Sequence, residues 1–172
     1  MSNPWSRLSA GVQFPNGPGQ STDNLTALNN NTMLCLGSIG ASNFVYGDFI
    51  VAPIKFKSGA SGVSANGTVS LYLFTSEDGT IWTCGVSPSA AGDQSGQLAI
   101  GPTAPGGGPR IPAQVVNVTA AGTQYYFDEF SVYDLLSWVP TFFTVGILNQ
   151  SGAAFDSTAA NFSAKVTTDQ YA

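Results

Sequence analysis

The fold of this chain is most clearly indicated by residues 68–82, TVSLYLFTSEDGTIW. Residues 68–75 alternate as an extended strand does, so successive side chains lie on opposite faces. One face carries Val69, Leu71 and Leu73, and the other carries Ser70, Tyr72 and Phe74. Because both faces hold large apolar side chains, we expect a strand that is covered on both sides. Gly79 can adopt the positive φ of a tight turn, and residues 81–86 are expected to return as the hairpin partner.

Further strands are expected on both sides of this one. Residues 48–57, DFIVAPIKFK, are rich in β-branched and aromatic residues, and Pro53 predicts either an edge strand or a bulge. Alternation predicts other strands at 113–118, 124–130, 142–149, 153–156 and 162–168. Residues 131–140, SVYDLLSWVP, predict one short helix that Ser131 caps and Pro140 terminates.

Many short strands and one short helix predict an all-β fold, an antiparallel β-sandwich of the jelly-roll type. Residues 1–33 are rich in Pro, Gly and Asn and predict an extended N-terminal arm, which either lies across a neighbouring subunit or is a loose terminus. Residues 34–172 are expected to form the sandwich domain. Within it, the Gly- and Pro-rich residues 87–110 predict a long loop.

Composition and charge exclude several classes of partner. Of the 172 residues only 9% are charged, and five Lys and Arg stand against ten Asp and Glu, for a net charge of −5. Five cations are too few to neutralise a run of phosphates. Nucleic acid is therefore not expected as a partner. No stretch approaches the roughly 18 apolar residues of a membrane-spanning helix, and the first residues lack a secretory signal, so no membrane association is expected.

The residues needed for most kinds of catalysis are missing. The chain has no His, which excludes a Ser-His-Asp triad, and it contains no GxxxxGK[ST], GxGxxG or HExxH motif. Two acidic pairs remain, Glu77–Asp78 in the expected turn and Asp128–Glu129 in a strand, where neighbouring side chains point to opposite faces. We therefore predict no catalytic residue, no cofactor and no metal. Cys35 and Cys84 are expected to be buried free thiols, with a disulfide as the alternative.

Aromatic residues are the better candidates for a binding surface. Tyr72 and Trp82 could form an exposed platform on the expected hairpin, or they could pack in a core. The rings of residues 125–127 and 142–143 occupy both faces of their strands, which indicates a subunit interface. The predicted partner-contact residues are Trp5, Phe14, Tyr72 and Trp82.

The C-terminal third also resembles a known family. Its matching pieces are an aromatic and acidic strand end with a short helical turn (130–136), Pro140, an apolar strand (143–148), NQSGAA (149–154) and a last strand (162–168). Residues 71–82, a strand and turn, also look similar to part of this family. These pieces resemble the jelly-roll structural proteins of tailed bacteriophages.

The resemblance implies a virion protein, a capsid cement or decoration protein made in the host cytoplasm. Such a protein would bind the head surface as a homotrimer, contacting the major capsid protein and identical subunits. The alternative is a receptor-binding or carbohydrate-binding jelly roll of a tail fibre or baseplate, which would use Tyr72 or Trp82 to stack on a sugar.

Overall fold

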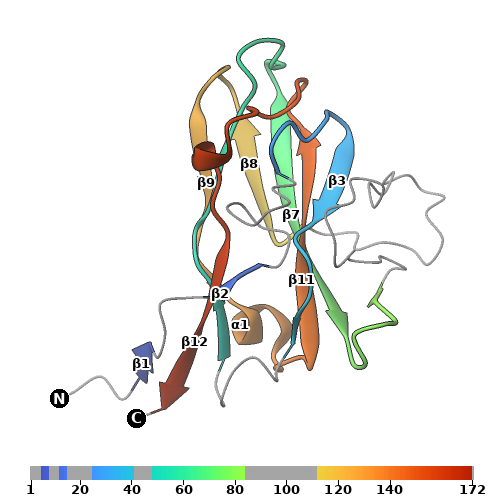
Figure 1. Ribbon diagram of the computed structural model, residues 1–172, viewed down its shortest axis with the longest axis vertical. Helices are drawn as coiled ribbons and strands as arrows, with labels where there is room; N and C mark the ends of the chain where they lie inside the picture. The colour runs from blue at the N-terminus through green and yellow to red at the C-terminus, as the bar shows by residue number, and fades with distance from the viewer. Residues whose placement is uncertain (1–4, 8–11, 15–24, 41–47, 84–111, 172) are drawn as a thin grey trace.

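The computed structural model describes residues 5–7, 12–14, 25–40, 48–83 and 112–171, and these form two layers of antiparallel strands (Figure 1). The expected all-β sandwich with one short helix is confirmed. No helix within the described ranges is long and apolar enough to cross a membrane.

The first layer is built around β12 (Lys165–Tyr171). On one side β12 pairs with β1 (Trp5–Arg7) and β2 (Val12–Gln13), and on the other with β5 (Asp48–Val51), which in turn pairs with β10 (Phe130–Ser131). The layer continues in β6 (Ile54–Lys57) and its partner β9 (Gln124–Phe127).

The strand expected at 48–57 is interrupted at Pro53, because Ala52 and Pro53 separate β5 from β6. Since β5 lies between β10 and β12, the break interrupts a strand inside the layer and not at its edge. Beyond the break, Lys55 and Ser163 exchange two backbone hydrogen bonds of 2.9 and 3.1 Å, which keep β6 beside the chain that leads into β12.

The second layer has the order β3 (Thr32–Cys35), β11 (Phe142–Gln150), β7 (Gly67–Ser76) and β8 (Gln114–Val118). The short strand β4 (Ile39–Gly40) pairs with the other end of β11. The hairpin expected at 68–86 forms in part within the described residues. β8 pairs with β7 only as far as Leu71, and after the turn the chain returns to β7 in an isolated antiparallel bridge between Ser76 and Trp82. Residues 84–86 lie outside the described residues.

The main core lies between the two layers. Phe49, Val51 and Val166 of the first layer meet Leu71, Val145 and Ile147 of the second, and the rings of Phe49 and Phe143 are 5.0 Å apart. The opposite face of the second layer is also apolar. It carries a second buried cluster, which we call the outer cluster: Met33, Cys35, Tyr72, Phe74, Trp82 and Leu148. The prediction that β7 is covered on both faces is confirmed.

The expected N-terminal arm is part of the sandwich wherever the structure describes it. β1 and β2 pair with β12, and Phe14 is fully buried with its ring edge-on to Phe143 at 6.1 Å. Leu25 and Leu28 are fully buried as well. In this segment, single apolar residues that lie among Pro, Gly and Asn anchor the chain to the core. The domain boundary expected after residue 33 falls inside β3. The loop predicted at 87–110 lies outside the described residues.

A helix forms inside the expected range of 131–140, but it stops before Pro140, so Pro140 does not terminate it. α1 (Val132–Leu136) begins after Ser131, whose Oγ accepts a 2.8 Å hydrogen bond from the backbone N–H of Asp134. It ends at Ser137, which has a φ of +62°. The strand expected at 153–156 is absent. That segment instead donates backbone hydrogen bonds from Phe155 to Leu28 and from Asp156 to Lys57, and it leads into the 3-10 turn η4 (Ala159–Asn161).

Candidate functional site

α1 lies toward one end of the sandwich (Figure 1). Large apolar side chains in and just after α1 are exposed. We call this surface the α1 patch, and it consists of Tyr133, Leu135, Trp138 and Val139, each between 42% and 50% exposed. Val132 is buried and Leu136 is partly buried against the main core. Because surface helices usually expose polar side chains, apolar exposure of this extent marks a surface that can bind a partner.

Beside the α1 patch, the turn after β7 is held by its own side chains. Asp78 Oδ1 accepts hydrogen bonds of 2.8 Å from the backbone N–H groups of Thr80 and Ile81. Ser76 Oγ donates to the carbonyl of Ile81 at 2.6 Å and accepts from Gly79 N–H at 2.9 Å. The N–H groups of Ile81 and Thr80 hold the pKa of Asp78 well below its usual range. Gly79 has the positive φ that the sequence predicts, +75°.

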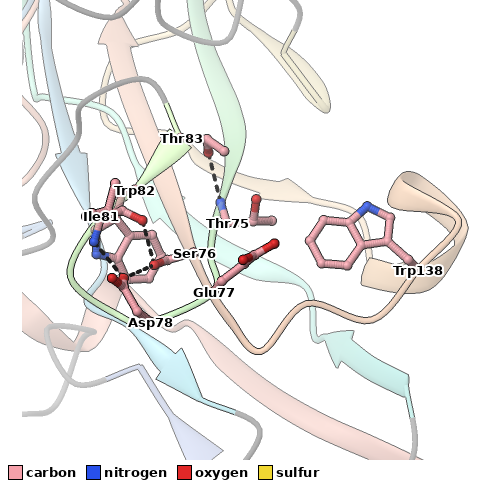
Figure 2. Close-up of a pocket in the computed structure, with 8 residues that line it drawn as sticks. All are labelled: Thr75, Ser76, Glu77, Asp78, Ile81, Trp82, Thr83 and Trp138. Carbon is pink, nitrogen blue, oxygen red and sulfur yellow. Dashed lines mark hydrogen bonds between the residues drawn. The ribbon is translucent and has the colours of Figure 1, made fainter.

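A pocket of about 520 Å³ lies between this turn and Trp138. Its lining residues are Thr75, Ser76, Glu77, Asp78, Ile81, Trp82, Thr83 and Trp138. Figure 2 shows the carboxylate of Glu77 pointing toward Trp138, while Asp78 turns back into the loop. Thr83 Oγ1 accepts a 3.1 Å hydrogen bond from Thr75 N–H, which holds the chain after the turn against β7. A preformed hollow therefore combines an exposed indole with an exposed carboxylate.

Three of the four predicted contact residues are not available at the surface. Tyr72 and Trp82 are 8% and 6% exposed in the outer cluster, so of the two alternatives they pack in a core and do not form an exposed platform. The indole N–H of Trp82 is also used, because it donates to the carbonyl of Gly79 at 3.2 Å. Phe14 is fully buried in the main core and has no surface left for a partner. Trp5 lies in β1, and its side chain lies outside what the structure describes.

Sequence reasoning missed Trp138 and Tyr133 as surface residues. A signal for Tyr133 was present, because at about 100° per residue Val132, Tyr133, Leu135 and Leu136 spread over an arc of about 160°, wider than the stripe of about 100° with which a helix faces a core. A single core can bury only one side of such a helix. Some of these apolar side chains had to remain exposed.

Both acidic pairs that the sequence singles out are exposed. Asp128 and Glu129 are exposed between β9 and β10, and Glu77 and Asp78 lie in the turn described above. Within the described ranges, His, Cys, Asp and Glu form no group of three or more that could hold a metal ion. Cys35 is a free thiol, and burial raises its pKa to about 12, so it stays protonated at neutral pH. Cys84 lies outside the described residues.

Comparison with known proteins found no matching family model, no matching curated protein and no matching solved structure. The geometry of the α1 patch and the adjoining pocket is therefore what bears on function.

Proposed function

We propose that this chain is a non-enzymatic structural protein of a bacteriophage particle, a cement protein that binds the head surface as an oligomer through the α1 patch. The observation that carries the proposal is the exposure of four large apolar side chains within seven residues. Aromatic residues are enriched at the centres of protein interfaces, where they supply much of the binding energy. Tyr133 and Trp138 would fill that role here.

The strand order supports a jelly-roll arrangement. In the described part of the chain, β1 with β2, β3 with β4, β5 with β6 and β9 with β10 can each be counted as one interrupted strand. The layers then have the orders first, eighth, third, sixth and second, seventh, fourth, fifth. Eight strands arranged as two Greek keys are typical of jelly rolls, which include both viral capsid and lectin domains. Because one fold hosts both functions, the residues on the surface are what can distinguish between them.

The surface favours the assembly role. Tyr72 and Trp82, the residues on which the sugar-binding alternative depended, are buried. The α1 patch has four exposed apolar side chains, which is more than the single aromatic ring on which a sugar would stack. Attachment of many copies to a repeating head would give avidity even where each contact is weak.

The test is cosedimentation with heads of the parent virus that lack this chain. Wild-type protein should bind saturably, at a fixed number of copies per capsomer. A Leu135→Ser, Trp138→Ser double variant should bind at least about tenfold more weakly, a loss of about 1.4 kcal/mol. The matched control is Val115→Ser, Tyr126→Ser, which removes two exposed apolar side chains from β8 and β9.

Thermal unfolding of each variant would establish that it folds. Wild-type binding to host cells but not to heads would contradict the proposal and favour a tail receptor. Equal head binding by both double variants would also contradict it, because the α1 patch would then not be the contact.

A further inference from the structure

The pocket beside Trp138 carries negative charge that its own lining does not balance. Among the described residues that line it, Glu77 and Asp78 are acidic and none is basic. The carboxylate of Asp78 is committed to the turn by two backbone N–H groups. Glu77 is exposed and points across the pocket toward Trp138, so it is the carboxylate that faces an incoming group (Figure 2).

An indole opposite a carboxylate suits one kind of ligand group, a cation on an organic side chain. Tryptophan is the aromatic residue that attracts cations most strongly, and the carboxylate adds a charge-assisted hydrogen bond. A guanidinium fits better than an ammonium. It is planar, so it can stack on an indole, and its fork of N–H donors can engage a carboxylate with two parallel bonds.

We propose that this pocket binds the guanidinium of an arginine that a partner protein presents within an apolar surface. The inference rests on the proposed function, because it names a feature of the partner that binds the α1 patch. Trp138 belongs to both the pocket and the patch, and Ile81, which is 78% exposed, extends the apolar surface on the side of the turn. The patch would supply contact area, and the arginine would fix the register of the partner.

Charge is what separates this ligand from a sugar. A neutral sugar also stacks on tryptophan, but it does not require an unbalanced carboxylate. The whole chain carries ten acidic residues against five basic ones, so a cationic group would also be attracted toward this surface before contact. An arginine therefore uses every feature of the pocket, whereas a sugar uses only part of them.

The test is fluorine NMR of the full chain labelled with fluorotryptophan, and the Trp138 signal can be assigned with a Trp138→Phe variant. The probe is N-acetylarginine amide, and its control is N-acetylcitrulline amide, which has nearly the same shape without the charge. Millimolar arginine probe should shift the Trp138 signal saturably, and the citrulline probe should bind at least about threefold more weakly. Added salt should weaken the arginine response.

Two substitutions test whether Glu77 is the carboxylate that the guanidinium contacts. Glu77→Gln should weaken binding of the arginine probe by at least about threefold. Asp128→Asn, which removes one exposed carboxylate between β9 and β10, should leave it unchanged. Equal responses to the two probes, a shift of other tryptophan signals but not that of Trp138, or a response to glucose but not to the arginine probe would each overturn the inference.

The probe experiment and the head-binding assay fail independently. If the arginine probe fails while Leu135→Ser, Trp138→Ser still abolishes head binding, the cement role stands and the arginine pocket does not. If the probe binds as expected and no head binding occurs, the pocket stands and its partner is another protein.

Discussion

At the scale of single residues, Asn149 explains why the NQSGAA stretch has its sequence. Its side chain is fully buried, and its Nδ2 donates to the carbonyls of Leu28 and Ala153, both at 2.8 Å. Its Oδ1 accepts from the N–H of Ser151 at 3.0 Å and from the Ser151 hydroxyl at 2.7 Å. Gly152 follows with a φ of +94°, and a Cβ there would collide with Ser64. The motif is therefore a structural device that joins β11 to the segment before β3.

Replacing Asn149 with Asp should destabilise the fold by about 3 kcal/mol. The substitution keeps the shape of the side chain, but it removes both N–H donors and places a carboxylate oxygen against two buried carbonyl oxygens. Chemical denaturation at neutral pH would measure the change. Asn117→Asp is the matched control, because Asn117 is exposed on β8, and it should change the stability by less than about 0.5 kcal/mol. Similar losses in the two variants would show that the Asn149 network does not hold the turn.

At the scale of elements, α1 shows what local sequence can and cannot indicate. The sequence predicted the cap at Ser131. It did not predict that Asp48, on β5, accepts hydrogen bonds from the Ser131 hydroxyl and, at 2.9 Å, from the N–H of Tyr133. These residues lie more than 80 positions apart along the chain. Only the pairing of β5 with β10 brings them together.

Asp48→Ala should loosen α1 while leaving the sandwich folded. Loss of the carboxylate removes two acceptor contacts at the start of the helix, at a cost of about 1 to 2 kcal/mol. Hydrogen exchange should rise in a peptide covering residues 130–137 and stay unchanged in one covering residues 142–150. Asp128→Ala, a change of an exposed carboxylate, serves as the control. Unchanged exchange at α1 would mean that Ser131 alone holds the helix.

The strands show the same division between local and distant information. Alternation predicted β7, β8 and β11 to within one or two residues, because each has a covered apolar face. Alternation does not say which strand pairs with which, so the pairing of β7 with β11 and β8 was not predicted. The strands β1 to β4 were missed because each has four residues or fewer and lies among Pro, Gly and Asn.

The candidate site was predicted only in part. The turn with Gly79 and Asp78 follows from local chemistry and was predicted correctly. Trp82 was a candidate either for an exposed platform or for a core. It lies in a core, because the chain after the turn covers the outer face of the second layer. Trp138 became a candidate only when the structure placed it across the pocket from Glu77.

At the scale of the whole molecule, the second layer separates two apolar regions. The main core lies on one face and the outer cluster on the other, which accounts for a chain that is 43% apolar and 12% aromatic. Gly146 makes the outer cluster possible, since a Cβ at this position would lie 2.6 Å from the ring of Phe74 and 3.0 Å from the sulfur of Met33. The glycine thus lets both side chains pack directly on the sheet.

The thiol of Cys35 can test whether the outer cluster behaves as a true core. Cys35 is buried there, and burial raises its pKa to about 12, so both access and thiolate content are low. In a Cys84→Ser variant, we expect no reaction with an aromatic disulfide reagent in the native state and one reactive thiol in concentrated guanidinium.

Adding Trp82→Ala should speed the native reaction, because it removes the largest side chain of the cluster. Val115→Ala, which shortens an exposed side chain of β8 in the same layer, should not change the rate. Rapid native labelling with Trp82 in place would show instead that this face opens independently, as a region of low local stability.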